Sequence, residues 1–267
     1  MFVDIRIDSK DDLQYLCGRT DCGARRVGRT LASLVNDLKL EQLDQQAYPS
    51  EWRIADVLSH VGSGAVIMRH SIDAAVSGNA VEEGFNQSVW DEWNAKGAAV
   101  RATEALAADR ALPERIASLS DAERDSFHFA MGPFRLDLAA FLRLRLNEHV
   151  LHTWDVEVAL HPDATLPADA VAILIDNLEM IAGFASKSDG HERVLTVHTT
   201  QPSRAFSVNV DPERVSMTSA EPSAPVDSEL PSESFVRLVY GRLDPGHSPA
   251  DIESPELEQL RGLFPGF

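Results

Sequence analysis

The stretch LDLAAFLRLRLNEHVLHTWDVEVAL, residues 136–160, decides how this chain of 267 residues is interpreted. It contains no Gly or Pro, and its apolar residues recur at steps of three and four, which is the pattern of an amphipathic α-helix. At about 1.5 Å per residue, this helix would be roughly 37 Å long. We expect it to end at His161, because Pro162 disfavours helical geometry in the residue before it.

Three upstream segments share this helical period. Their expected ranges are 11–43 with a break near Gly23, 50–76 with Ser50 as the N-cap, and 88–109 followed by a short helical stretch at 113–119. Four long amphipathic segments joined in this way are typical of a helix bundle. A further helix over 168–185 would lead out of the bundle.

The hydrophobic period changes from helical to alternating after Gly190. The alternation is clearest in two runs, Val194, Thr196 and His198, and then Phe206, Val208 and Val210. Further strands are expected at 214–219 and 226–230, followed by a helix at 231–240 that ends at Gly241. The fold class is therefore α plus α/β, with a helix bundle at 1–186 and a small α/β domain at 187–267.

The charge and the apolar runs exclude several classes of partner. The chain has 42 acidic and 24 basic side chains, a formal charge of −18, which repels phosphate backbones and anionic lipids. Its apolar runs are shorter than the roughly 18–20 residues that cross a bilayer, and MFVDIRIDSKDD lacks the features of a signal peptide. We expect a soluble cytoplasmic monomer or homodimer that binds neither nucleic acid nor membrane.

The two cysteines, Cys17 and Cys22, lie in a segment that we expect to be helical. Two cysteines do not make a disulfide framework, so the thiols are expected to stay reduced. A pair with four intervening residues and no second pair nearby is also unlike the usual zinc spacings.

A stripe of polar residues lies on the helix expected over 136–160. Phe141, Arg145, Glu148, His152 and Asp155 follow one another at steps of four, three, four and three. An unpaired buried carboxylate costs on the order of several kcal/mol, so Glu148 and His152 need each other or a shared cation. A divalent metal would satisfy both. Asp155 either orients His152 or lies in solvent, and Arg145 either holds Glu148 or binds a substrate carboxylate.

The helix expected over 50–76 offers a third ligand. His60 lies on its apolar face, which must point into the bundle. One histidine from this helix and the Glu/His pair from the other give three N/O ligands with an open position, as in catalytic zinc sites. The alternative is an ordinary helix-surface pair, because the same Glu-x-x-x-His spacing also occurs at Glu157 and His161 on the opposite face.

Three segments carry a resemblance to a known family. They are EWRIADVLSHV (51–61), RLRLNEHVLHTWDVEVAL (143–160) and SFVRLVYGRL (234–243), and they resemble the mycothiol-dependent maleylpyruvate isomerase family. The resemblance covers about residues 52–242. It implies a DinB-like four-helix bundle followed by a sterol-carrier-protein-like α/β domain.

The resemblance also implies a metal centre and a thiol cosubstrate. His60, Glu148 and His152 would be the zinc ligands, and the fourth position would take water or the thiol of mycothiol. Zinc lowers the pKa of a bound thiol, so that a thiolate exists near neutral pH. In an isomerase this thiolate adds reversibly to a conjugated double bond. In a transferase it attacks an electrophilic carbon and stays attached.

The substrate does not follow from the resemblance. A dicarboxylate calls for paired arginines, since a guanidinium binds a carboxylate with two hydrogen bonds, yet no arginine lies between Arg69 and Arg101. Arg237, Arg242 and Arg145 are the candidate catalytic residues. A structural role for the two arginines near the C-terminus is the alternative.

Two tryptophans, Trp90 and Trp93, are candidates for lining a cofactor pocket, although either would also serve in the core.

We expect the protein to be a zinc-dependent, mycothiol-using isomerase or S-transferase, whose partners are a small electrophilic or conjugated substrate and a low-molecular-weight thiol. The alternatives are a metal-dependent hydrolase of DinB fold, in which zinc hydroxide replaces the thiolate, and a non-catalytic small-molecule-binding protein.

Overall fold

The computed structural model describes residues 3–5, 30–131 and 134–266, which fall into two compact units, Met1–Ala164 and Thr165–Phe267. The first unit is mostly helical and the second contains a sheet, so the predicted fold class, α plus α/β, is confirmed. The units divide earlier in the sequence than the expected boundary at 186/187. Among the described helices, none combines the length and the apolar character needed to span a membrane.

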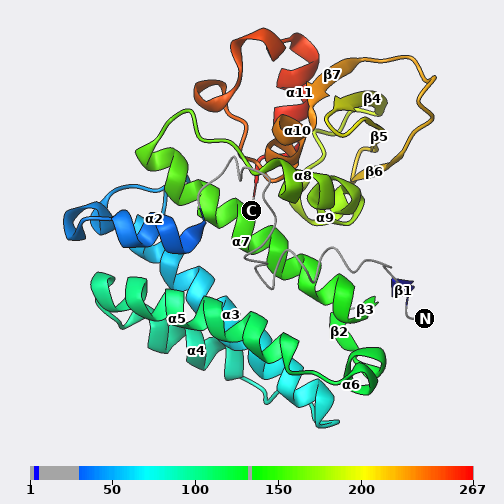
Figure 1. Cartoon of the computed structure of the whole chain (residues 1–267). Helices are drawn as coiled ribbons and strands as arrows, with labels where there is room; N and C mark the ends of the chain where they lie inside the picture. Colours follow the sequence, from blue (N-terminus) through cyan, green and yellow to red (C-terminus); the bar gives the residue numbers. More distant parts are fainter. Residues whose placement is uncertain (1–2, 6–29, 132–133, 267) are drawn as a thin grey trace. The chain divides into compact units, whose positions relative to one another are not determined.

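The first unit is a helix bundle around α3 (Ile54–Val76), which contacts α4, α5 and α7 (Figure 1). The other helices are α2 (Leu31–Asp37), α4 (Phe85–Asn94), α5 (Ala98–Ala117), α6 (Asp121–Ser126) and α7 (Leu138–Leu160), with a 3-10 turn η1 (Leu40–Asp44). Helix α7 agrees closely with the predicted long helix. It supplies one wall of the site described below.

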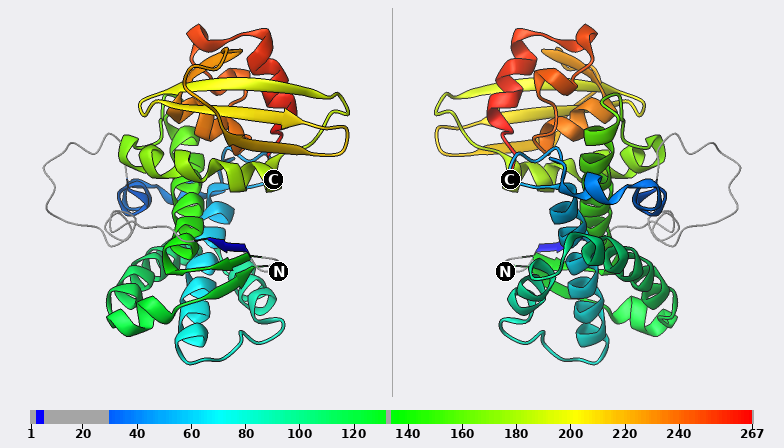
Figure 2. Two further views of the ribbon diagram at one scale, coloured as in Figure 1. Left: turned by 90° about the vertical axis from the view of Figure 1, so that its right-hand side faces the viewer. Right: turned by 90° about the vertical axis from the view of Figure 1, so that its left-hand side faces the viewer.

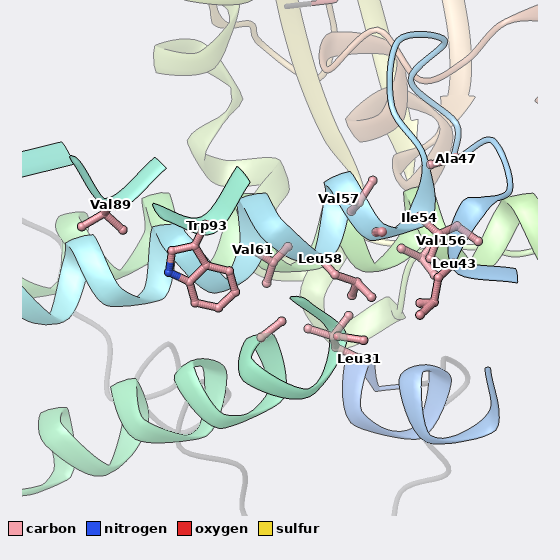
Figure 3. Packing of buried hydrophobic residues seen from close by; sticks show 13 residues of the cluster. Leu31, Leu43, Ala47, Ile54, Val57, Leu58, Val61, Val89, Trp93 and Val156 are labelled. Carbon is pink, nitrogen blue, oxygen red and sulfur yellow. The ribbon is translucent and has the colours of Figure 1, made fainter. Parts of the chain in front are cut away.

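Buried side chains of α3, α4 and α5 meet in one cluster of the bundle core. Figure 3 shows the Trp93 side chain of α4 beside Val61 of α3, and Trp93 is only 4% exposed. Gly62 permits this approach, because a Cβ at that position would lie 2.3 Å from the indole ring. Burying such aromatic surface stabilises the bundle, and truncating a buried Phe or Trp to Ala typically costs about 3–5 kcal/mol.

In the part that the structure describes, the first predicted helix is helical over Leu31–Asp37 but does not continue to residue 43. Helix α2 ends at Asp37, and η1 follows as a separate turn. The rest of that prediction, 11–29 with Cys17 and Cys22, lies outside the described residues.

The second predicted helix begins later than expected, at Ile54. Residues 46–53 instead form a closed loop with an isolated bridge between Gln46 and Arg53. A side chain of the first helical turn stabilises the start of the helix: the Asp56 carboxylate accepts a hydrogen bond from the Arg53 amide at 2.9 Å. The predicted N-cap Ser50 is therefore wrong. The N-cap residue is Arg53.

The third predicted helix is two helices. Helix α4 ends at Asn94 and α5 starts at Ala98, after Gly97 in extended geometry. The separate helical stretch expected at 113–119 is largely the end of α5, which continues through Pro113 to Ala117.

The first unit also contains a small sheet that was not predicted. Its strands are β1 (Val3–Ile5), β2 (Phe129–Met131) and β3 (Phe134–Leu136), with β3 parallel to β1 and antiparallel to β2.

The second unit is a four-stranded sheet of order β6-β5-β4-β7. Its strands are β4 (Arg193–Thr200), β5 (Arg204–Val210), β6 (Val215–Ser219) and β7 (Ser228–Pro231). Strand β4 pairs antiparallel with β5 and parallel with β7, and its alternating side chains bury Leu195 and Val197 on one face. These strands confirm the predicted alternating period.

Four helices complete the second unit. They are α8 (Ala168–Leu174), α9 (Leu178–Ala185), α10 (Ser232–Val239) and α11 (Pro255–Leu263). Helix α9 contacts β6, and α10 contacts β4 and β7, beside the yellow strands in Figure 2. The helix predicted over 168–185 is therefore two helices that pack within the second unit. The predicted end of α10 at Gly241 is confirmed, since this glycine has a φ of +67°.

Candidate metal centre

Helices α3 and α7 bring the three predicted ligands together. The Nε2 atom of His60 lies 2.8 Å from Oε2 of Glu148, and Nε2 of His152 lies 3.4 Å from the same oxygen. All three ligand atoms lie within 4.8 Å of one another. Ligand atoms around a tetrahedral zinc are about 3.3 Å apart when the bonds are near 2.0–2.1 Å. The cluster therefore has the size that a divalent cation needs.

The carboxylate of Glu148 is kept ionised by its neighbours. Burial by itself would raise the pKa of Glu148, but hydrogen bonds and charge from His152 and His60 outweigh it and hold this pKa below its ordinary value. One anionic oxygen and two imidazole nitrogens form a donor set that suits zinc or a similar divalent metal. The side chain of Glu148 is 48% exposed, so the cluster is open to solvent on that side.

The imidazole of His152 has a second support. Its Nδ1 lies 2.7 Å from Oδ2 of Asp155, a carboxylate that is completely buried. Metal-binding histidines usually donate the hydrogen of their other ring nitrogen to a carboxylate or carbonyl, which leaves Nε2 free for the metal. Of the two interpretations given for Asp155, this contact fits the orienting one.

Arg145 contacts Asp109 and Val61, and not Glu148, which was one of its expected partners. Its guanidinium donates to Oδ1 of Asp109 at 2.8 Å and to the carbonyl of Val61 at 3.1 Å, and its side chain is 3% exposed. The same Asp109 oxygen lies 3.1 Å from Nδ1 of His149. This cluster ties α5 and α3 to α7 beside the candidate metal centre. The catalytic role of Arg145 stays a prediction.

Asp109 and His149 are neighbours of the site that the sequence reasoning did not select. Burial by itself would raise the pKa of Asp109, but His149 and Arg145 lower it to about 2. The contacts cross from α5 to α7, so no spacing within one segment reveals them.

Trp52 is a further site residue that was missed. Its ring centroid lies 5.1 Å from that of His60 and 5.6 Å from that of His152, and it is nearly parallel to the latter ring, at 24°. Trp52 precedes α3, so helical periodicity does not mark it. The available signal was its place in the family-like segment EWRIADVLSHV.

The two candidate cofactor-lining tryptophans differ in their surroundings. Trp93 is a core residue of the first unit, as the alternative interpretation held, and Lys96 lies over its ring at 4.2 Å. Trp90 is 41% exposed. A cofactor role for either remains a prediction.

The remaining candidate arginines lie in the second unit. The guanidinium of Arg237 forms two hydrogen bonds with the Glu233 carboxylate, at 2.7 and 3.0 Å, and also donates to the carbonyls of Arg242 and His247. Arg242 donates to the Tyr240 carbonyl at 2.9 Å. These contacts organise the end of α10, and catalytic roles for both arginines stay predictions.

The fold and the site together define a class of protein, a helix bundle with a His/Glu/His cluster joined to a small α/β unit. The sequence model of the mycothiol maleylpyruvate isomerase N-terminal domain matches residues 24–157, which is half of the chain. The chain therefore belongs to this family, and the resemblance predicted from the sequence is confirmed.

Solved structures show the same fold. The crystal structure of the mycothiol-dependent maleylpyruvate isomerase is 14% identical in sequence, with a TM-score of 0.60 over 85% of this chain and 89% of that chain. A histidine-to-alanine mutant of that isomerase matches at 13% identity, with the same TM-score and coverage. No curated protein matches significantly.

Proposed function

We propose that this chain is a mycothiol-using enzyme, an isomerase or S-transferase, with zinc or another divalent metal held by His60, Glu148 and His152. The observation that carries the proposal is the convergence of these three ligand atoms within 4.8 Å in a member of this family. The substrate would be a small electrophilic or conjugated molecule. We place the reaction in the cytoplasm, where a low-molecular-weight thiol is kept reduced.

Each residue of the cluster has a role that its contacts support. Glu148 supplies the anionic oxygen, and Asp155 holds the Nδ1 hydrogen of His152 so that Nε2 can bind the metal. The partial exposure of His60 and Glu148, 36% and 48% of their side chains, leaves an approach for a second molecule. A zinc ion bound there would lower the pKa of an incoming thiol and so provide a thiolate near neutral pH.

The test is metal content and mycothiol binding, measured on the wild type and on Glu148→Ala. We expect about one zinc per chain in the wild type and none in the variant. Saturating mycothiol should stabilise only the metal-loaded protein, by about 2.7 kcal/mol at a hundredfold excess over Kd.

Three other outcomes would change the proposal. A wild-type protein free of metal would reject both the mycothiol-using enzyme and a metal-dependent hydrolase, and would favour a small-molecule-binding protein. A protein that binds zinc but is not stabilised by mycothiol would favour a hydrolase that uses zinc-bound water. Equal zinc content in Glu148→Ala would move the metal to other ligands.

A further inference from the structure

The two histidines of the candidate centre are supported differently. His152 has the buried Asp155 carboxylate on its Nδ1. Within the part of the chain that the structure describes, Nδ1 of His60 has no hydrogen-bond partner, and the His60 side chain is 36% exposed. A ligating imidazole normally has such a partner, because it fixes the tautomer and the ring orientation. Besides Glu148, the His60 ring contacts two aromatic rings, those of Trp52 and His152.

The indole of Trp52 lies against both imidazoles. Its centroid is 5.1 Å from the His60 ring at 48° and 5.6 Å from the His152 ring at 24°. The two imidazoles also contact each other edge to face, at 4.6 Å and 70°. All three separations fall in the range of roughly 4.5–7 Å in which aromatic rings attract. The three rings therefore form one packed group.

Trp52 is itself held firmly by its backbone. Its amide donates to the Pro49 carbonyl at 3.0 Å, and its carbonyl accepts from the Ala47 amide at 3.0 Å and from the Gln46 side chain at 2.6 Å. The side chain is half-buried and packs on the bundle core. The closed loop over 46–53 thus presents the indole at a fixed place just before α3.

We infer that Trp52 is a positioning residue for the metal centre: its indole holds His60 in its ligating orientation through a tilted ring contact, whereas His152 is held by a carboxylate. This inference rests on the proposed metal site. It predicts that metal affinity depends on the aromatic face at position 52 and not only on the apolar volume there.

The test compares Trp52→Phe and Trp52→Leu with the wild type by zinc competition against a chromophoric chelator. Loss of a group that orients a ligand typically lowers metal affinity about 10–100-fold, so we expect Trp52→Leu to lose at least about 10-fold. Trp52→Phe keeps a ring and should retain affinity within about threefold. The visible spectrum of the Co²⁺-loaded protein should change in Trp52→Leu, because His60 is no longer fixed.

Phe85→Leu is the matched control. Phe85 stacks on His70 at 3.8 Å and 21°, in the same bundle but outside the candidate centre, so its loss should leave zinc affinity unchanged. Wild-type affinity and spectrum in folded Trp52→Leu would overturn the inference, and so would equal losses in Trp52→Phe and Trp52→Leu. A wild type that binds no metal would instead overturn the proposed function.

Discussion

Two histidines on α3 have similar first contacts and different neighbourhoods. Nε2 of His60 lies 2.8 Å from a Glu148 oxygen, and Nε2 of His70 lies 2.8 Å from a Glu82 oxygen. Each imidazole also lies against an aromatic ring. Judged by these contacts alone, both are His/Glu/aromatic clusters at the surface of one bundle.

The difference lies in what the opposite helix adds. At His60, α7 supplies both the carboxylate and a second imidazole, His152, which Asp155 orients from behind. At His70 the carboxylate comes from the segment before α4, and no second imidazole or cysteine joins it among the described residues. A histidine–carboxylate pair is thus not sufficient for a metal site. The second nitrogen ligand with its own support is the deciding feature.

The largest expected effect is the difference in zinc affinity between a variant of the candidate centre and a variant of the His70 pair. We predict that His152→Ala lowers zinc affinity by more than about 100-fold, beyond the loss of a supporting residue, because a direct ligand is removed. His70→Ala should bind zinc as the wild type does. Zinc competition on both variants measures this, and a similar loss in His70→Ala would erase the distinction between the two sites.

The support behind His152 should give the next largest effect. Asp155→Asn keeps the shape of the side chain but removes its charge, so we expect about 10-fold weaker zinc binding. Asp244→Asn is the matched control, since Oδ2 of Asp244 lies 2.8 Å from Nδ1 of His247 in a His–Asp pair of the second unit. Isothermal titration with zinc distinguishes them. Undiminished affinity in Asp155→Asn would remove the orienting role.

Asp109 should make the stability of the first unit depend on pH. Its pKa is about 2 in the folded chain, against an ordinary value of 3.8, so its stabilising contribution is present above about pH 4 and is lost as pH falls towards 2. We expect a loss of about 2 kcal/mol over that window. Asp109→Asn should flatten this part of a urea-unfolding series measured on metal-free protein at successive pH values. An unchanged pH profile in the variant would show that the ion pairs with Arg145 and His149 do not stabilise the fold.

The smallest effect is expected at the His70 pair. Glu82 is a mostly exposed side chain, 71% accessible, and its own backbone hydrogen bond together with His70 lowers its pKa from the ordinary value. Solvent screens such pairs, so Glu82→Gln should leave the urea midpoint close to that of the wild type. A large shift of the midpoint would mean that this cluster, too, is an organised site.

Much of the fold followed from local pattern. The long helix over 136–160 and the alternating strands after Gly190 were predicted because hydrophobic period reports which faces are buried. The N-terminal helices were placed less well, because their limits depend on single contacts such as the Asp56 carboxylate on the Arg53 amide. The small sheet has strands of three residues, too short for any period to show.

The candidate site was predictable where its residues share one helix. Glu148 and His152 are one turn apart, and the apolar face of the second helix indicated His60. Asp109 could not be found in this way, because its partners lie on another helix. Trp52 lies in a loop whose shape depends on backbone hydrogen bonds, which leave no periodic mark in the sequence.

The proposed function requires that His60, Glu148 and His152 hold a cation that still accepts a sulfur ligand. X-ray absorption at the zinc edge, on the wild-type protein with and without mycothiol, measures the ligands of this cation. Without the thiol we expect nitrogen and oxygen scatterers alone, at about 2.0–2.1 Å, and with it one added sulfur at about 2.3 Å. A spectrum that gains no sulfur when mycothiol is present would contradict the proposed function.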